Sequence, residues 1–478
     1  MIFNSIAFLV FFIILFFLYW IVAKNNHKLQ NFILLFGGYI FYGWSDWRLS
    51  SYLIAASAIN FFLGIYIEKS NNPKYKQWLL YVGLLQGIGG LSFFKYFNFF
   101  VISFKDAFHE LGIELNISTL NLLVPIGISF FTFKTISYLL DINKGKMTAC
   151  KDWVAFFTYV SFFPTILSGP IDRAKNFIPQ LERERTFEYE KAMIGVRQIF
   201  WGLFKKVVVA NTLSIVVSDI FTGYKELNTI TLLFGAIVYS FQMYADFCGY
   251  SDMAIGIARL LGFDVTPNFN YPFMAENIAD FWRRWHMSLT SWLTEYVFTP
   301  LSIAFRDYDK LGLIISIIIN FVICGIWHGA NWTFVLWGLL HGFYFIPLIL
   351  KGTFNKKKKA VKGKLFPSLK QVLNMIGTFM IVSLTLVLFR ANTITEGIGY
   401  YKQLLHFSTI HPFSIEVSTN KKETFICIFM LLLIDFWFSR DIKPFKIPRP
   451  LRFTFYTIIS ILILVSLGKE ESFIYFKF

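Results

Sequence analysis

Residues 311–350 read LGLIISIIINFVICGIWHGANWTFVLWGLLHGFYFIPLIL, a stretch of forty residues without lysine, arginine, aspartate or glutamate. Lys310 comes directly before the stretch and Lys351 directly after it. The hydrocarbon core of a bilayer is about 30 Å thick and takes about 20 helical residues to cross. Forty apolar residues between two lysines therefore predict a hairpin of two membrane-spanning helices, with both outer ends on the cytoplasmic side.

The rest of the chain repeats this pattern. Of its 478 residues, 56% are hydrophobic and 15% are charged, whereas a soluble domain carries about 25% charged residues. We therefore predict an all-α fold, a polytopic transmembrane helix bundle with about 11 to 13 membrane segments, as a single domain over residues 1–478. The run 230–261 is long enough for a tilted helix with a break, or for a helix and a re-entrant piece. The predicted segments are 2–23, 31–44, 52–68, 78–94, 122–140, 153–167, 196–217, 230–261, 311–326, 330–350, 372–389, 425–438 and 453–467.

The distribution of lysines predicts the orientation. Lys24 and Lys28 follow the first segment, and Lys69 and Lys74 follow the third. Because cytoplasmic loops carry an excess of lysine and arginine, we expect the N-terminus outside and the loop 356–364 inside. The same bias accounts for the net charge of +16, and no motif supports nucleic acid binding. The first segment has no cleavage site, so it is expected to stay as a span, and the four isolated cysteines suggest no disulfide framework or zinc site.

His328 is the first candidate for chemistry, because ionisable side chains inside a membrane are costly and mark functional sites by default. It lies beside the midpoint of the hairpin, between Gly325 and Gly329, which allow a tight, broken backbone. We expect it at the hairpin tip, deep in the membrane, where a neutral imidazole can act as a general base near pH 7. The alternative is a structural histidine satisfied by a backbone carbonyl at the helix end.

The second candidate is FWRRWHMSLTSW, residues 281–292. Its large apolar residues follow helical spacing, which predicts an amphipathic helix at the cytoplasmic interface. Arg283 and Arg284 lie off the apolar face and could pair with phosphates of a coenzyme or carrier. The alternative is an ordinary membrane-surface helix with snorkelling arginines.

The third candidate is YSFQMYADFCGYSD, residues 239–252, where polar residues interrupt an apolar run. Asp246 could orient a histidine or bind a hydroxyl group, or it could belong to a structural hydrogen-bond network between helices. His341 follows His328 by 13 residues and could lie along the same passage or cap an inter-helix contact. No carboxylate–histidine spacing supports a metal site.

These motifs together resemble the membrane-bound O-acyltransferase (MBOAT) family, in its bacterial branch typified by the alginate O-acetyltransferase membrane subunit. WHG at 327–329 and RWH at 284–286 carry the resemblance, which extends in order over nearly the whole chain. One departure follows Pro300-Leu301, where the branch usually has a glycine-rich turn and this chain has Ser302-Ile303-Ala304. Further matching blocks are YGWSDWR (42–48), FKYFNFF (94–100), PIGISFFTF (125–133), SGPI (168–171), 239–256, 281–292, LFRA (388–391) and FIYFKF (473–478).

The resemblance implies a helix bundle around a passage through the membrane. His328 falls at the family's catalytic histidine and His286 at its second conserved histidine. The implied reaction passes an acetyl group from a cytoplasmic thioester, acetyl-CoA or an acyl carrier, to an extracytoplasmic polysaccharide. The donor would enter from the side of Arg283, Arg284 and His286.

Within that reaction, His328 would act either as a base toward the acceptor hydroxyl or as a covalent acyl carrier. Asn331, Tyr244 or backbone N–H groups near Gly329 would hold the oxyanion. No bound cofactor or metal is expected. The expected partners are the glycan, membrane lipids and a periplasmic or extracellular transferase, and the expected location is the bacterial cytoplasmic (inner) membrane, as a multi-pass protein.

Three alternatives stay open from the sequence. Peptidoglycan is as compatible with acetyl transfer as an alginate-like exopolysaccharide. The rival enzyme reaction is D-alanyl transfer from a carrier protein to teichoic acid. A transporter is the rival of another class, because midplane polar groups among many spans also describe one, although no internal repeat is found.

Overall fold

The computed structural model describes residues 1–354, 366–406, 421–439 and 448–467. Within these residues the regular structure is helical and contains no strand. Eight helices of this described part are long and apolar enough to cross a membrane. The predicted all-α transmembrane bundle is therefore confirmed. These helices are Arg48–Lys69, Pro73–Glu110, Tyr189–Thr222, Thr229–Leu260, Arg306–His328, Trp332–Leu350, Leu369–Arg390 and Arg449–Ser466, and Ile6–Val22 is a shorter apolar helix.

The chain divides into two compact units, which are described separately. The first consists of residues 1–200 and 251–266, and the second of residues 201–250 and 267–478. The expectation of a single domain over 1–478 stays a prediction.

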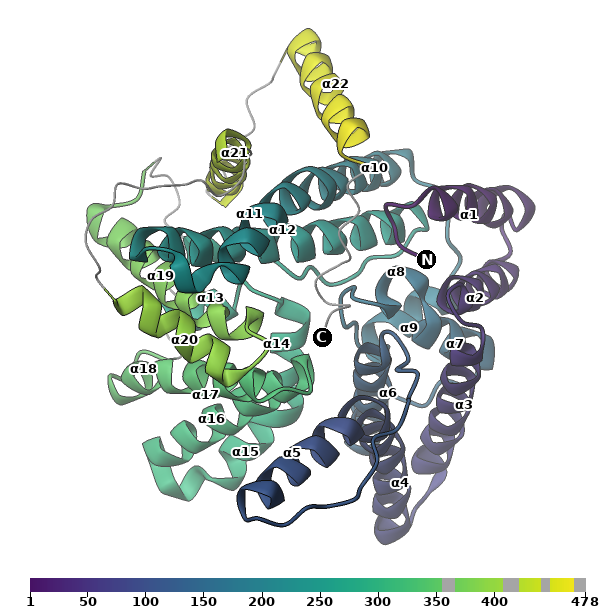
Figure 1. The fold of residues 1–478 in the computed structure, drawn as a ribbon. Coiled ribbons are helices and arrows are strands. Elements are labelled where there is room, and N and C mark those ends of the chain that lie inside the picture. The colour runs from purple at the N-terminus through teal and green to yellow at the C-terminus, as the bar shows by residue number, and fades with distance from the viewer. Residues whose placement is uncertain (355–365, 407–420, 440–447, 468–478) are drawn as a thin grey trace. The chain divides into compact units, whose positions relative to one another are not determined.

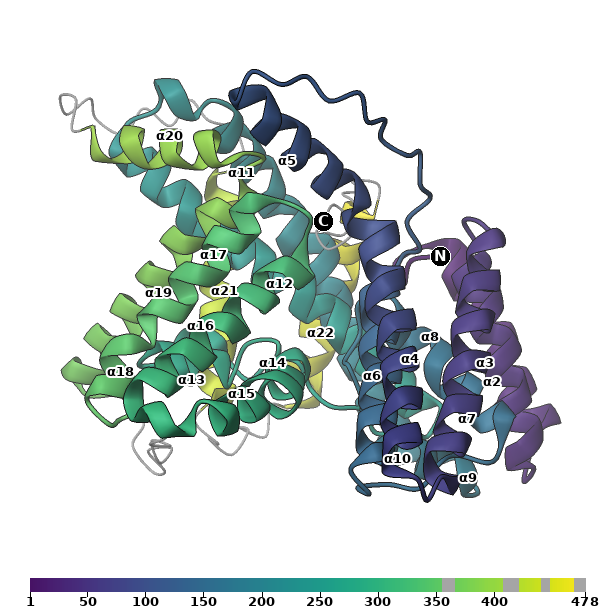
Figure 2. The ribbon, with the colours of Figure 1, turned by 90° about the horizontal axis from the view of Figure 1, so that it is seen from below.

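The first unit contains the N-terminal helices. Helices α3, α4 and α6 pack on one another, and α2 packs against α7 (Figure 2). The 32-residue helix α12 contributes its C-terminal end, residues 251–260, to this unit. The elements are α1 (Ile6–Phe17), η1 (Leu18–Val22), α2 (His27–Gly43), α3 (Arg48–Lys69), α4 (Pro73–Leu91), η2 (Ser92–Tyr96), α5 (Phe97–Glu110), α6 (Ile128–Asn143), α7 (Trp153–Ser161), α8 (Phe163–Ile166), α9 (Ala174–Glu182) and α10 (Tyr189–Leu203).

The second unit is built around an antiparallel helix pair. Helices α16 and α17 pack along each other (Figure 1). Helix α19 also packs on α17. The elements are η3 (Phe204–Ala210), α11 (Asn211–Thr222), η4 (Tyr224–Glu226), α12 (Thr229–Leu260), η5 (Pro272–Met274), α13 (Ile278–Trp282), α14 (Met287–Leu293), η6 (Thr294–Phe298), α15 (Thr299–Ala304), η7 (Arg306–Tyr308), α16 (Asp309–His328), α17 (Trp332–Tyr344), α18 (Ile346–Leu350), α19 (Leu369–Arg390), α20 (Ile394–Leu405), α21 (Lys421–Ser439) and α22 (Arg449–Ser466).

Several helices begin where the sequence supplies a side-chain cap. The Asn72 side chain accepts hydrogen bonds from the first backbone N–H groups of α4, and Pro73 occupies the first turn, where its missing N–H is not needed. Asp152 caps α7 in the same way. Ser368 and Gln371 form a reciprocal capping box at the start of α19. Local sequence therefore sets these helix starts before any packing.

The run 230–261 forms one continuous α-helix, α12, without the break or re-entrant piece suggested by its length. The predicted segment 122–140 is wrong at its start, because the helix begins only at Ile128. Pro125 cannot donate a backbone hydrogen bond, and Gly127 adopts a left-handed φ of 79° that ends any helix there.

Sequence analysis also missed helix α5. The fourth predicted segment, 78–94, ends too early, because the helix continues through the π-helical segment η2 to Glu110. The loop 356–364, expected inside the cell, lies outside the described residues.

Candidate functional site

The predicted hairpin is present, and His328 is the last residue of its first helix, α16. Gly329 follows in extended backbone, and the Asn331 side chain caps α17 by accepting from the Thr333 N–H at 3.0 Å. At the open end, the Lys310 ammonium donates to the Leu350 carbonyl oxygen at 3.0 Å. The tip is therefore limited to residues 329–331, directly beside the imidazole.

Gly325 has a different role from the predicted one. It lies inside a continuous α-helix and does not break it. A Cβ at this position would collide with the Phe334 carbonyl oxygen on α17, and a Cβ at Gly338 would collide with the Phe321 carbonyl oxygen on α16. The two glycines allow the helix backbones to approach closely, as small residues do between transmembrane helices.

The His328 ring is enclosed by aromatic side chains. Ring centroids of Trp327, Trp337 and Phe389 lie 4.9, 5.3 and 5.0 Å from that of His328. Only 6% of His328 is exposed. His328 is therefore buried inside the second unit, because α17 and α19 place Trp337 and Phe389 against it.

His286 lies near the same indole ring. Its ring centroid is 5.8 Å from that of Trp327 and 4.6 Å from that of Phe247. The residue is fully buried, and burial lowers the pKa of His286 to about 3, which keeps its imidazole neutral at pH 7. The rings of both predicted histidines, His286 and His328, therefore lie against the indole ring of Trp327.

The segment around His286 is not the predicted continuous amphipathic helix. Helix α13 ends at Trp282 and α14 starts at Met287, with His286 in a left-handed conformation at φ 43°. Such a residue cannot continue a right-handed helix. The break is held by Asn268, whose carbonyl oxygen accepts from the Met287 N–H at 2.8 Å, and whose side-chain oxygen accepts from the Ser288 hydroxyl at 2.6 Å.

The apolar face of this segment packs into the protein, and its position at the cytoplasmic interface stays a prediction. Arg283 donates to the Phe354 carbonyl oxygen at 2.7 Å. Arg284 forms an ion pair with Asp280 at 3.0 Å. Both guanidinium groups are half-buried, and phosphate binding by them stays a prediction. The buried residues of that face are Phe281, Trp282, Trp285, Leu289 and Trp292.

His341 joins the same aromatic cluster from the second arm of the hairpin. The Trp282 indole donates to His341 Nδ1 at 3.2 Å, which places the proton of the neutral imidazole on Nε2. The His341 ring lies 4.7 Å from that of Trp337, centroid to centroid. Trp337 therefore contacts both His328 and His341.

Sequence reasoning missed Trp282 and Trp337 as members of the site. Trp337 precedes His341 by four residues on α17, so the two share a helix face, and this spacing could have identified it. Its indole Nε1 is buried and has no hydrogen-bond partner among the described residues. A buried N–H donor beside a histidine is costly to leave unused and is available to a ligand oxygen.

The remaining predicted residues lie in the second unit with other contacts. Asp246 forms a buried ion pair with Lys206 of η3. The Tyr244 ring packs among aromatic rings, including that of Phe273 at 5.0 Å. The Asn331 amide donates to the Asn392 carbonyl oxygen at 2.7 Å. Direct roles in substrate binding for these three stay predictions.

The site is built from imidazole and indole groups. The described residues bring no three histidine, cysteine or carboxylate side chains together in a way that could hold a metal ion. In chemical terms, a neutral imidazole beside an N–H donor in a dry aromatic enclosure can accept a proton and stabilise a developing oxyanion.

Comparison with known proteins bears on this chemistry. The model of the membrane-bound O-acyltransferase family matches residues 151–390, a range that contains all three histidines of the site. The probable alginate O-acetylase AlgI of Pseudomonas aeruginosa is 32% identical over 418 residues, which cover 86% of this chain and 76% of that protein.

Two further relatives have other acceptors in their names. The peptidoglycan O-acetyltransferase of Helicobacter pylori is 31% identical over 407 residues, covering 80% of this chain and 75% of that protein. The teichoic acid D-alanyltransferase of Bacillus subtilis is 32% identical over 249 residues, covering 50% of this chain and 62% of that protein.

Proposed function

Because the chain belongs to the membrane-bound O-acyltransferase family, we propose that it passes acetyl groups from acetyl-CoA across the membrane for the O-acetylation of an extracytoplasmic polysaccharide. The observation that carries this proposal is the share of the chain that is similar to O-acetyltransferases. It spans 86% and 80% of the chain for the alginate and peptidoglycan enzymes, against 50% for the D-alanyltransferase. An alginate-like exopolysaccharide or peptidoglycan is the proposed acceptor, and the bacterial cytoplasmic membrane is the proposed location.

His328 is the proposed catalytic residue. As a general base, its imidazole removes the proton from the acceptor hydroxyl while the oxygen attacks the thioester carbonyl carbon. The C–S bond then breaks, and the thiolate of coenzyme A takes the proton from the imidazolium. In the covalent alternative, the imidazole itself attacks the thioester carbonyl carbon and the thiolate of coenzyme A leaves. The acceptor hydroxyl then attacks the acetyl-imidazole in a second step, which frees the imidazole and transfers the acetyl group to the hydroxyl oxygen.

The oxyanion of either tetrahedral intermediate needs a donor. The Trp337 indole N–H supports this role because it is buried beside His328 without a partner among the described residues. A fixed donor in a water-excluded site stabilises an oxyanion strongly. Asn331, the donor suggested from the sequence, already donates its amide to Asn392, which makes Trp337 the better candidate.

A membrane-embedded histidine answers the topological problem of this reaction. Acetyl-CoA is cytoplasmic, whereas the proposed acceptor lies outside. The hairpin tip carries His328 into the bilayer from the two lysine-flanked ends that are predicted to be cytoplasmic. A separate extracytoplasmic transferase is the proposed partner that places the acetyl group on the glycan.

The test uses isolated membranes that contain the full-length protein. Labelled acetyl-CoA and carrier-bound labelled D-alanine are supplied in parallel, and release of coenzyme A and label in the glycan fraction are measured. We expect turnover of acetyl-CoA that is lost in the His328→Ala variant. Turnover of carrier-bound D-alanine alone would contradict the proposal in favour of teichoic acid modification, and passage of label without thioester cleavage would indicate a transporter.

A further inference from the structure

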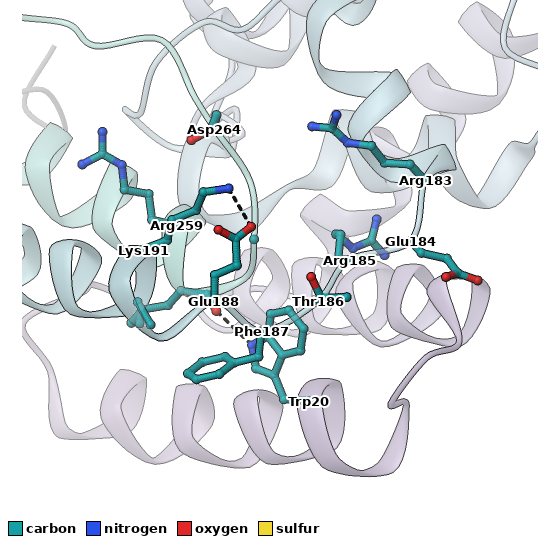
Figure 3. A pocket seen from close by; sticks show the side chains of 13 residues that line it. Trp20, Arg183, Glu184, Arg185, Thr186, Phe187, Glu188, Lys191, Arg259 and Asp264 are labelled. Atoms are coloured by element: carbon teal, nitrogen blue, oxygen red, sulfur yellow. Dashed lines mark hydrogen bonds and ion pairs between the residues drawn. The ribbon is translucent and has the colours of Figure 1, made fainter.

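A pocket of about 260 Å³ lies within the first unit and shares no residue with the histidine site (Figure 3). Its walls come from η1, the segment between α9 and α10, the first turn of α10, and the C-terminal end of α12 with the residues after it. Trp20 and Phe187 form its apolar edge, with ring centroids 5.5 Å apart. The remaining lining is rich in charged side chains.

Four cations and three carboxylates line this pocket. Lys191 pairs with Glu188 at 2.7 Å. Arg259 donates to the neutral Gln198 amide oxygen at 2.6 Å, so its charge is not cancelled by that bond. Arg183 is exposed and forms no ion pair or hydrogen bond with any residue of the described part. Positive charge therefore remains at the pocket after the internal pairing.

Arg185 adds a buried positive charge to the pocket wall. It is only 6% exposed. Its Nη1 donates to the Gln180 carbonyl oxygen at 2.9 Å and its Nη2 to the Asn31 side-chain oxygen at 2.7 Å. These acceptors are neutral, and no carboxylate pairs with Arg185 among the described residues. Burial lowers the pKa of Arg185, and the like charge of Arg183 adds to this effect.

A buried guanidinium without a counter-charge is costly, and an anion in the pocket would relieve that cost. The Arg185 Nε atom is buried and has no partner among the described residues. The first turn of α10 also lines the pocket, and backbone N–H groups at a helix start favour anions. Guanidinium groups and a helix start together are the chemistry that recognises phosphate.

We propose that this pocket binds the phosphate group of an anionic phospholipid. Phe187 lies 6.2 Å from Phe16 of α1, centroid to centroid, and Ile13 and Phe17 on α1 are exposed. The acyl chains can follow this apolar surface away from the pocket. Trp20 and the neighbouring Lys24 mark the predicted cytoplasmic end of the first span, where basic pockets bind anionic headgroups.

The experiment measures lipid binding to full-length protein in detergent by native mass spectrometry, with phosphatidylglycerol and phosphatidylcholine as probes. Arg183→Gln removes one cation and Glu184→Gln removes one carboxylate, and neither side chain forms a hydrogen bond or an ion pair with another described residue. Lys74→Gln is the matched control, because Lys74 is also exposed, is predicted on the same membrane side and does not line the pocket.

We expect the protein to prefer phosphatidylglycerol, with affinity about fivefold weaker in Arg183→Gln. Glu184→Gln should bind this lipid more tightly, and Lys74→Gln should bind it as the unchanged protein does. Equal retention of both lipids, or equal affinity in Arg183→Gln and Lys74→Gln, would overturn the proposal. Displacement of the lipid by inorganic phosphate or coenzyme A at micromolar concentration would also overturn it and assign the pocket to a soluble phosphate compound. Lipid binding is independent of acetyl transfer, so its failure leaves the proposed function untouched.

Discussion

The imidazole of His328 lies against three aromatic rings, those of Trp327, Trp337 and Phe389. Trp337 and Phe389 meet it nearly edge to face, at interplanar angles of 88° and 75°. Such an enclosure excludes water and fixes the ring plane, which favours a neutral base with a set direction for proton transfer. Proton transfer by His328 therefore depends on the surrounding aromatic side chains as much as on the imidazole itself.

The first prediction concerns His328 itself. Both His328→Ala and His328→Gln should lower acetyl transfer by about 10²–10⁴-fold, the range for a lost general acid–base group. The glutamine fills much of the buried volume, but its amide cannot accept the proton. Activity in membranes is normalised to folded protein, measured by thermal unfolding after solubilisation. More than about a tenth of normal activity in His328→Gln would leave His328 with a structural role only.

The second prediction concerns Trp337. The Trp337→Phe exchange keeps an aromatic ring beside His328 but removes the indole N–H. We expect kcat to fall by about 10²–10³-fold with little change in KM, as for a lost oxyanion donor. Trp332→Phe is the matched control, since Trp332 is half exposed at the start of the same helix. An equal effect of the two exchanges would remove the oxyanion role.

The third prediction concerns His286. His286→Ala should reduce acetyl transfer without abolishing it, mainly through a higher KM for the thioester donor. The imidazole is fully buried next to Phe247 and Trp327, so His286→Asn serves as a second variant that preserves more volume. Normal kinetics in a stably folded His286→Asn protein would exclude His286 from the site.

At the scale of elements, helix α12 is tied to the π-helical segment η3 by charge. The Lys206 and Asp246 side chains are 6% and 2% exposed and form an ion pair. The adjacent residue of η3, Lys205, donates to the Cys248 sulfur at 3.2 Å. Buried charges inside a membrane protein persist only when they are paired. The Asp246 carboxylate is therefore better explained as a link between helices than as a free substrate ligand.

The fourth prediction tests that link. Asp246→Asn should lower the free energy of unfolding by about 3–5 kcal/mol, because it leaves a buried ammonium group without its counter-charge. The double variant Lys206→Met with Asp246→Leu should recover most of that loss. Thermal unfolding of the solubilised protein measures both. A stable Asp246→Asn protein without acetyl transfer would instead support the role in substrate binding.

At the scale of the whole molecule, the orientation in the membrane follows from where the lysines lie between spans. The helical segment Pro73–Glu110 has 38 residues, about 57 Å if straight, which exceeds the bilayer core of about 30 Å. Its two ends are therefore predicted on opposite sides of the membrane, with Lys74 inside and Leu111 outside. The four native cysteines are buried, so single introduced cysteines can report on the sides.

The fifth prediction uses those two ends. Leu111→Cys should react with an impermeant maleimide added to intact cells, whereas Lys74→Cys should react only after the cells are opened. Lys358→Cys, in the loop expected inside, should behave like Lys74→Cys. Labelling of Lys74→Cys from outside would reverse the orientation and with it the side from which the donor is proposed to enter.

Local sequence determined the membrane class, most helix positions and the hairpin with His328 at its tip, because apolar run length, flanking lysines and caps act over a few turns. Tertiary structure decided the rest, because the contacts come from residues far apart along the chain. Phe389 of α19 helps to bury His328, and Asn268 holds the break at His286 that helical spacing concealed. The Arg185 guanidinium in the wall of the basic pocket donates a hydrogen bond to Asn31, which lies 154 positions away in the sequence. No local sequence pattern predicts this contact.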